Sequence, residues 1–152
     1  MRLLAVAVAL ALPKSGALVP WRSLGGVGLG MTSAQVQRRW GLSHGRCRDC
    51  KQTTWYFNYA PFSPEGAAVR FRKGKVDAVW TLWKPEGWHL GPIVLDAPAS
   101  SLTGRWTALV TIDCGSYEAR ILSRRGVTTV IYVYTDKVWG FGLNRQGGSP
   151  CH

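Results

Sequence analysis

The sequence predicts an α+β protein built from two tandem repeats, each a short helix followed by an antiparallel three-stranded meander. Three observations support this prediction. A compact helix signal occurs in residues 32–41, and β-branched and aromatic residues dominate the segments after it. The separation between Thr32 and Asp96, two candidate helix caps, equals the separation between Cys50 and Cys114. The alternative is a single α+β domain without an internal repeat.

The first helix is predicted from signals at both of its ends. The hydroxyl of Thr32 is suited to accept a free amide of the first turn, and Gln35 lies where a capping box places its reciprocal partner. Gly41 supplies the residue that commonly ends a helix. Val36 and Trp40 are four residues apart, so they share one face and are expected to pack against a sheet.

Three strands are predicted in the first half, over 53–59, 67–72 and 75–83, with a tight turn at Lys73-Gly74. In the second strand Val69 and Phe71 share one face, while Arg70 and Arg72 share the other. In the third strand, strict alternation places Val76, Ala78, Trp80 and Leu82 on one face. One side of this sheet is expected to lie under the helix, and the other to carry apolar surface that meets another molecule.

The second half is expected to repeat this order after a linker at 84–92. Asp96 is a candidate cap for a helix over 97–106, in which Pro98 suits an early position and Gly104 weakens the prediction. Residues 107–114 are ambiguous. Further strands are predicted over 117–122, 127–134 and 138–143.

The N-terminal residues 1–17 are predicted to be a signal peptide, because Arg2 precedes an apolar run that is too short to span a bilayer. A membrane-anchored or buried N-terminal segment is the alternative. The repeats would then occupy 18–84 and 85–152. The protein is expected to be secreted or extracytoplasmic, with no transmembrane segment after signal removal.

The four cysteines form an even set in a chain predicted to be exported, which indicates disulfides. Three pairings are possible. We favour Cys47 with Cys50, and Cys114 with Cys151, because the second pair would hold the C-terminal segment in place. Two other hypotheses use the first pair: a zinc site with His44, and a redox-active dithiol.

The composition is basic, with 19 lysines and arginines against 8 acidic residues and a net charge of +11. This surplus favours a polyanionic partner, which we expect to be an acidic protein or an anionic component of the cell envelope. Basic residues near Trp55 and Tyr56 also suit nucleic acid, but export would separate the chain from that target.

The residues Gly30-Met31-Thr32, Gln35-Val36 and Trp40-Gly41 resemble the start of a repeat in a known superfamily. It joins the outer-membrane assembly lipoprotein BamE (the SmpA/OmlA group) with the secreted β-lactamase inhibitory proteins. The resemblance implies a non-catalytic role in protein binding through an aromatic-rich sheet surface. The Cys-x-x-Cys spacing and the absence of a lipidation cysteine depart from these relatives.

The resemblance implies partner-binding positions on the sheet. The aromatic candidates are Trp55, Tyr56, Trp83, Tyr132 and Tyr134, with Arg70 and Arg72 as the charges that would attract an acidic partner.

No catalytic, cofactor or metal residue is predicted. The chain has three histidines, and nothing in the sequence sets two carboxylates together. The glycine-rich stretch at 25–30 precedes too short a helix for a dinucleotide loop. The alternatives to a binding protein are a secreted enzyme or thiol redox protein using Cys47 and Cys50, and a polyanion- or nucleic-acid-binding protein.

Overall fold

The structure is a computed structural model that describes residues 16–57, 66–82, 87–107 and 109–152. Tyr59, Trp83 and residues 1–15 of the predicted signal peptide lie outside the described residues. The elements in chain order are β1 (Leu18–Val19), β2 (Ser23–Leu24), α1 (Ser33–Trp40), β3 (Gly45–Arg46), β4 (Thr54–Phe57), β5 (Gly66–Arg72), β6 (Lys75–Leu82), β7 (His89–Leu90), β8 (Ile93–Val94), η1 (Ala99–Ser101), η2 (Gly104–Trp106), β9 (Val110–Asp113), β10 (Glu118–Arg124), β11 (Val127–Tyr134) and β12 (Lys137–Arg145).

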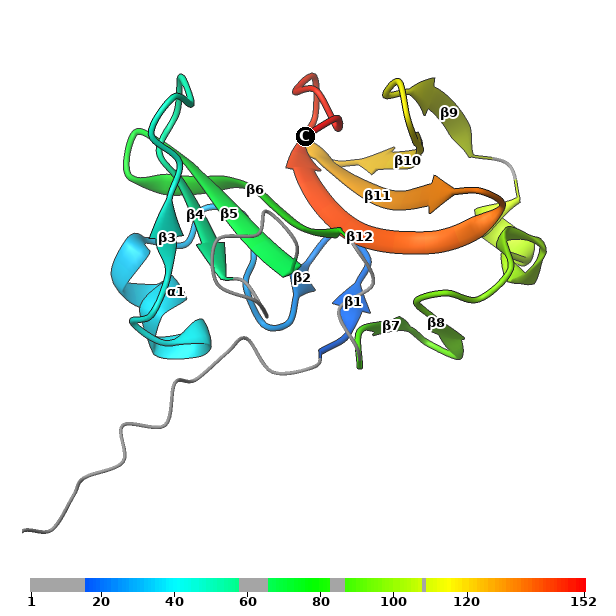
Figure 1. The fold of residues 1–152 in the computed structure, drawn as a ribbon, viewed down its shortest axis with the longest axis horizontal. Helices are drawn as coiled ribbons and strands as arrows, with labels where there is room; N and C mark the ends of the chain where they lie inside the picture. Colours follow the sequence, from blue (N-terminus) through cyan, green and yellow to red (C-terminus); the bar gives the residue numbers. More distant parts are fainter. Residues whose placement is uncertain (1–15, 58–65, 83–86, 108) are drawn as a thin grey trace, which may run out of the picture.

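Eight strands form one antiparallel sheet in the order β3-β4-β5-β6-β12-β11-β10-β9 (Figure 1). The first and second halves of the chain therefore contribute adjacent strands to a single sheet. They meet where β6 pairs with β12, with Trp80 opposite Gly142 and Ala78 opposite Asn144. The β5–β6 turn is the predicted Lys73-Gly74, and both residues have positive φ, as a two-residue hairpin turn requires.

The predicted helix is confirmed as α1, together with its caps. The Thr32 side chain accepts from the Gln35 amide, and the Gln35 side chain accepts from the Thr32 amide, which forms the capping box. Val36 and Trp40 are buried under the sheet, and the Trp40 ring meets Phe57 edge-on at 5.3 Å. In the described part of the chain, no helix is long and apolar enough to cross a membrane.

The prediction of a second helix over 97–106 is wrong. This segment forms only the short turns η1 and η2. Asp96 has a positive φ of 71°, which does not suit a helix cap, and its amide donates to the Val138 carbonyl. The Ala99 amide donates to the Asp136 carbonyl, so the segment pairs with the β11–β12 hairpin. The described fold is mostly β, with one helix and one eight-stranded antiparallel sheet, and not two helix-plus-meander repeats.

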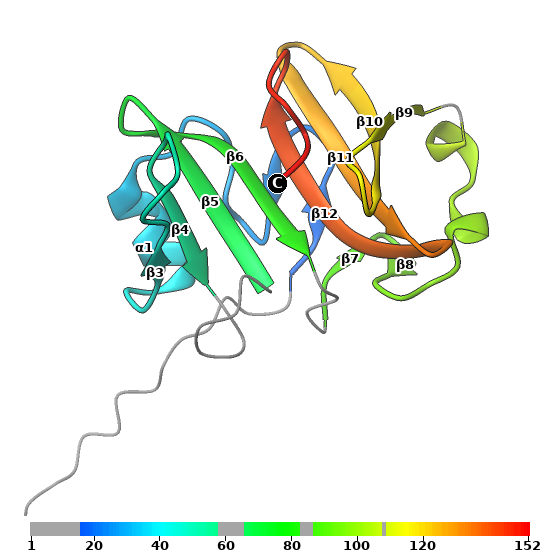
Figure 2. The ribbon, with the colours of Figure 1, turned by 45° about the horizontal axis from the view of Figure 1, so that its top comes forward.

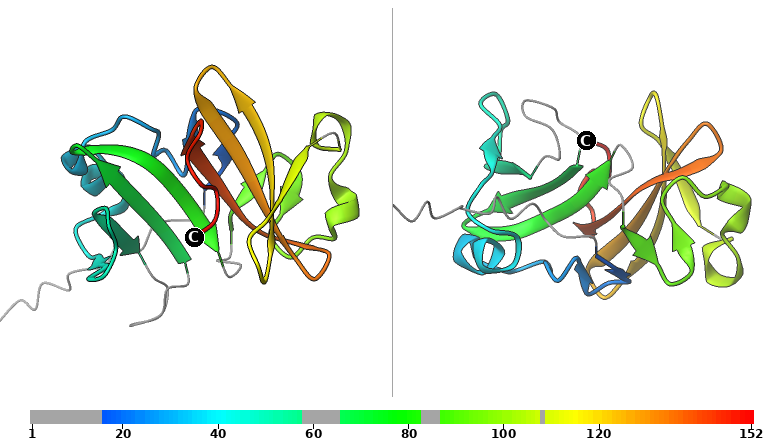
Figure 3. Two further views of the ribbon diagram at one scale, coloured as in Figure 1. Left: turned by 90° about the horizontal axis from the view of Figure 1, so that it is seen from above. Right: turned by 60° about the horizontal axis from the view of Figure 1, so that its bottom comes forward.

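The two faces of the sheet carry separate apolar clusters. The larger cluster lies on the α1 side and includes Val36, Trp40, Phe57, Ile131 and Phe141. The smaller cluster lies on the other face and consists of Ala68, Ala78, Trp80, Ala119, Val130 and Tyr132. The C-terminal segment lies over this second face at the junction of β6 and β12 (Figures 2 and 3).

A β-bulge in β6 overturns the strict alternation that was predicted for residues 75–83. Arg70 pairs with Ala78 and Phe71 pairs with Val76, which leaves Asp77 as the extra residue. Val76 therefore packs in the α1-side cluster, whereas Ala78 and Trp80 pack in the cluster on the opposite face.

Candidate functional site

A cleft of about 570 Å³ opens on the face of the sheet opposite α1. Its floor comes from β4, β5 and β6, which contribute Tyr56, Arg70 and Trp80. The loop at 50–52 and the C-terminal segment at 145–149, with His152, complete the lining. The strands place these side chains by alternation, since every second residue of a strand faces the same side.

Positive charge dominates the cleft. Lys51, Arg70, Arg72 and Arg145 line it, and Asp77 is the only carboxylate residue among the described residues of its lining. Arg70 Nε donates to Asp77 Oδ1 at 2.8 Å, and both side chains are largely buried, at 20% and 11% exposed. Because the bulge residue Asp77 neutralises only one cation, the cleft keeps a surplus of positive charge.

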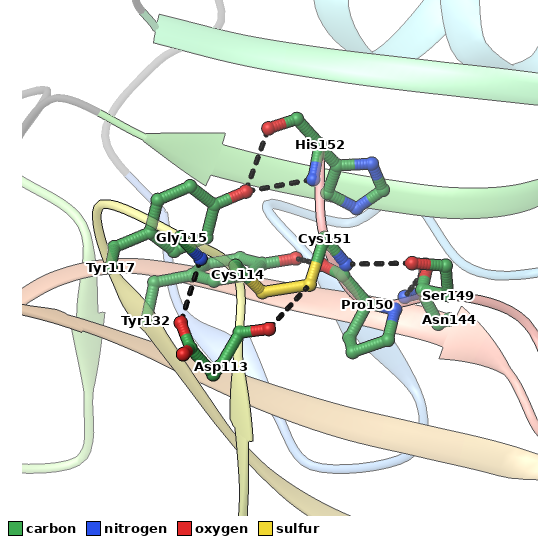
Figure 4. The surroundings of a disulfide bond; sticks show 10 residues. All are labelled: Asp113, Cys114, Gly115, Tyr117, Tyr132, Asn144, Ser149, Pro150, Cys151 and His152. Carbon is green, nitrogen blue, oxygen red and sulfur yellow. Dashed lines mark hydrogen bonds between the residues drawn. A yellow bond between two sulfur atoms is a disulfide. The ribbon is translucent and has the colours of Figure 1, made fainter.

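The C-terminal segment is fixed to the sheet by hydrogen bonds to two tyrosine hydroxyls (Figure 4). Tyr132 Oη donates to the Pro150 carbonyl at 2.8 Å in a fully buried position. The His152 amide donates to Tyr117 Oη at 2.7 Å, and the same hydroxyl donates to the His152 carbonyl at 2.7 Å. Burial first, and Tyr117 second, raise the pKa of Tyr132 well above 10, so its hydroxyl stays a donor.

Two further contacts hold the C-terminal segment, which forms one wall of the cleft. The side-chain amide of Asn144 donates to the Ser149 carbonyl at 2.9 Å. Cys151 is joined to Cys114, so the segment is covalently attached to the chain just after β9. This wall is thus held by a disulfide, by hydrogen bonds of which the one from Tyr132 is fully buried, and by the ring contact of His152.

The His152 ring lies flat on Trp80, with the ring centres 3.6 Å apart and the planes 3° from parallel. Part of the residue stays exposed, but the ring itself is desolvated by this contact. Desolvation first, and the positive charge of Arg70 second, lower the pKa of His152 to about 3. The imidazole is therefore neutral in the cleft at neutral pH.

Only some of the predicted binding residues come together. Tyr56, Arg70 and Arg72 line the cleft, and Arg70 and Arg72 lie on one face of β5 as alternation predicted. Tyr134 is 39% exposed and lies apart, near Trp139 at the β11–β12 turn. Trp83 is outside the described residues.

Two predicted aromatic contacts are corrected, because these side chains belong to the interior. Trp55 is 5% exposed and packs edge-on against Phe71 at 4.7 Å, under the stacked ring of His44. Tyr132 is 0% exposed. Neither ring forms part of an exposed contact surface, and each stabilises one of the two clusters.

Four further cleft residues were not among the predicted site residues: Lys51, Trp80, Arg145 and His152. The bulge at Asp77 turns Trp80 away from the α1 side, which alternation alone did not predict. Arg145 lies at the end of β12, and His152 reaches the cleft through the return of the C-terminal segment. The favoured pairing of Cys114 with Cys151 was the one available signal for that return.

Both disulfides form with the favoured pairing, Cys47 with Cys50 and Cys114 with Cys151. Both sulfurs of the Cys-x-x-Cys stretch are therefore bonded to each other in this structure. The ring of His44 stacks on Trp55 at 3.8 Å, and burial lowers its pKa. Across residues 16–57, 66–82, 87–107 and 109–152, no group of three or more His, Cys, Asp or Glu side chains is arranged to hold a metal ion.

Comparison with known proteins gives a similarity in fold. No protein-family model matches the chain, and no curated protein matches it. An extracellular protein containing an SCP domain from Bacillus anthracis superposes with a TM-score of 0.52 at 11% identity, covering 78% of this chain and 44% of that chain. A cysteine-rich secretory protein from Staphylococcus aureus gives 0.57 at 10% identity, covering 90% of this chain and 49% of that chain.

These comparisons overturn the resemblance to the BamE and β-lactamase inhibitory protein superfamily. The structural similarity is to bacterial proteins of the SCP/CAP (cysteine-rich secretory protein) class. This chain spans less than half the length of each of those two chains, and the low identity supports a shared fold alone. Both are extracellular or secretory proteins, and the two disulfides are consistent with an extracytoplasmic location.

Proposed function

We propose that the protein is an exported, non-catalytic binding protein whose basic cleft receives an acidic segment of a partner protein. One observation carries the proposal: of the described residues that line this cleft, four are basic and one carries a carboxylate. The partner would supply the carboxylates that balance the excess of basic residues in the cleft. Export into the extracellular medium is part of this proposal.

The chemistry of the lining favours a partner with carboxylates. Arg72 and Lys51 are exposed at the mouth of the cleft, and neither is within ion-pair distance of a carboxylate in the described residues. Charge-assisted hydrogen bonds between guanidinium and carboxylate groups are stronger than neutral ones. Tyr56, half-buried beside them, offers the kind of aromatic surface that is enriched at binding hot spots.

The cleft is also rigid before a partner arrives. The sheet forms its floor, and the Cys114–Cys151 disulfide with the Tyr117 and Tyr132 hydroxyls fixes one wall. A preformed site loses less conformational entropy on binding than a loop that must become ordered.

The direct test is calorimetric titration of the protein with a glutamate-rich peptide. The variant Lys51→Gln/Arg72→Gln removes two cations from the cleft. The control Lys73→Gln/Lys75→Gln removes the same charge from the neighbouring β5–β6 hairpin, where neither residue lines the cleft. Net charge is thus matched between the two variants.

We expect the cleft variant to bind the peptide at least about tenfold more weakly, because each lost charge-assisted hydrogen bond contributes about 1.5–3 kcal/mol. The control should change affinity by less than about threefold, since exposed charges that make no direct contact with the peptide act weakly. Equal losses in both variants would show that general charge, and not the cleft, holds the peptide, and would reject the proposal.

A further inference from the structure

A second cationic surface lies on the opposite face of the molecule, and we call it the Arg–Trp patch: Trp21, Arg105, Trp106 and Arg124. The two tryptophan rings stack with their centres 6.5 Å apart and their planes 26° from parallel. Arg105 Cζ lies 5.9 Å from the Trp21 ring centre and 6.0 Å from that of Trp106. Arg124 Cζ lies 5.4 Å from the Trp21 ring centre.

Trp21 is held firmly in this arrangement. Its amide donates to Thr129 Oγ1 at 2.9 Å, and its indole Nε1 donates to the Leu122 carbonyl at 2.9 Å. The pairing of β9 with β10 ends at Ile121. The indole therefore bonds to the carbonyl of Leu122, which is the next residue of β10 after that pairing. Trp21 also has a φ of 59°, a conformation that a non-glycine residue keeps only where its surroundings enforce it.

The two guanidinium groups have unused hydrogen-bonding capacity. Arg105 and Arg124 are exposed, and neither lies within ion-pair distance of a carboxylate in the described parts of the chain. A guanidinium held over an indole by a cation–π contact, as the Cζ–ring distances indicate for both arginines, still has N–H groups that can donate to a ligand. A guanidinium edge donates two parallel hydrogen bonds to one phosphate group.

We propose that the Arg–Trp patch is a second binding site, which takes the phosphate groups of an anionic polymer. Arg105 and Arg124 both lie over the ring of Trp21, so two guanidinium groups are held close to the same indole. They could bind two phosphates of one flexible chain, because each phosphate offers several oxygens to a guanidinium group. The indoles reduce the entropy that the arginines lose when they become fixed on a ligand.

This site is independent of the proposed cleft. The side chain of Thr129, which anchors Trp21, lies on the α1 side of the sheet, because its neighbour Val130 belongs to the opposite cluster. Trp80 and the C-terminal segment lie on that opposite face. A polymer on the patch and an acidic segment in the cleft can therefore bind at the same time.

The test uses linear inorganic polyphosphate as the probe, with binding followed by tryptophan fluorescence and by calorimetry. The variant Arg105→Gln/Arg124→Gln removes both guanidinium groups. The variant Arg105→Lys/Arg124→Lys keeps the charge but loses the planar guanidinium group. Arg38→Gln/Arg39→Gln is the charge-matched control, because both residues are exposed on α1 and contact no aromatic ring in the described structure.

We expect polyphosphate affinity to fall by about tenfold or more in the glutamine variant and by a smaller but clear factor in the lysine variant. The α1 control should change it by less than about threefold. Binding of a glutamate-rich peptide, which tests the cleft, should be the same in all four proteins. An unchanged lysine variant, or an equal loss in the α1 control, would overturn the proposal by showing that charge alone suffices.

Discussion

Removal of the Cys114–Cys151 disulfide should destabilise the protein much more than removal of Cys47–Cys50. The first bond joins residues separated by 37 positions and the second joins residues separated by 3. In the chain-entropy treatment, the longer loop contributes about 4 kcal/mol to the free energy of unfolding and the shorter about 1.5 kcal/mol. The variants Cys114→Ser/Cys151→Ser and Cys47→Ser/Cys50→Ser should therefore differ by about 2 kcal/mol or more.

The structure adds a second reason for this difference. The disulfide from Cys114 brings the C-terminal segment to the buried Tyr132 hydroxyl and to the Trp80 ring. When the bond is lost, this segment has only its noncovalent contacts to hold it, and each release exposes part of the smaller apolar cluster. The Cys47–Cys50 bond lies in an exposed loop, so its loss uncovers no comparable surface.

Urea unfolding of the wild type and both variants, followed by circular dichroism, gives the free energies directly. Hydrogen exchange of the His152 amide, which donates to Tyr117 Oη, reports whether the segment has been released. Equal losses of stability in the two variants would contradict this prediction. Equal protection of the His152 amide with and without the Cys114–Cys151 bond would contradict it as well.

Three further predictions concern single positions. Tyr132→Phe should lower the free energy of unfolding by about 1–3 kcal/mol, because it leaves the Pro150 carbonyl without its buried donor, whereas Tyr134→Phe at an exposed site should leave urea stability unchanged. Gly140→Ala should lower the thermal unfolding temperature and reduce the free energy of unfolding by about 3 kcal/mol, because a Cβ there would overlap the Thr81 carbonyl oxygen at the β6–β12 junction. Gly45→Ala is the control, because a Cβ at that position meets only ordinary space. Equal unfolding temperatures of the two variants would contradict this prediction. The pKa of His152 is about 3 in the folded state and 6.5 in the unfolded state, so the folded protein binds fewer protons between these values. The free energy of unfolding should therefore keep the full contribution of His152 above pH 6.5 and lose it as pH falls toward 3. His152→Asn should flatten this part of the pH dependence of the urea midpoint, and an identical slope in that variant would exclude His152 as its source.

The elements predicted correctly are those whose signals are local. The Thr32–Gln35 capping box and Gly41 define α1 within one short stretch of chain, and the turn at Lys73-Gly74 is equally local. The predicted strand at 127–134 coincides with β11, where β-branched residues are densest.

The prediction of a second helix was wrong because hydrogen bonds to the β11–β12 hairpin determine the backbone conformation of that segment. Asp96 and Pro98 suggest a helix start in isolation, but the backbone from Asp96 to Ala99 bonds to the β11–β12 hairpin. No local pattern contains that partner. The apparent internal repeat relied on this helix, and the resemblance to a two-repeat superfamily was wrong together with it.

The candidate site was predicted only in part, because some of its residues are placed by local patterns and others by contacts between distant parts of the chain. Alternation along β5 correctly placed Arg70 and Arg72 on one face, because that rule needs only neighbouring residues. The bulge at Asp77 and the return of His152 to Trp80 depend on distant contacts, so Trp80 and the C-terminal wall were missed. Aromatic character alone did not separate the buried Trp55 and Tyr132 from residues that are accessible to a partner.

Mapping by nuclear magnetic resonance tests the binding cleft most directly. A glutamate-rich peptide would be titrated into isotope-labelled protein while backbone amides and arginine side chains are observed. We predict that the largest shifts occur at Lys51, Arg70, Arg72 and Arg145, with smaller ones at the C-terminal wall. Shifts confined to β9 and α1, with the cleft arginines unmoved, would contradict the account.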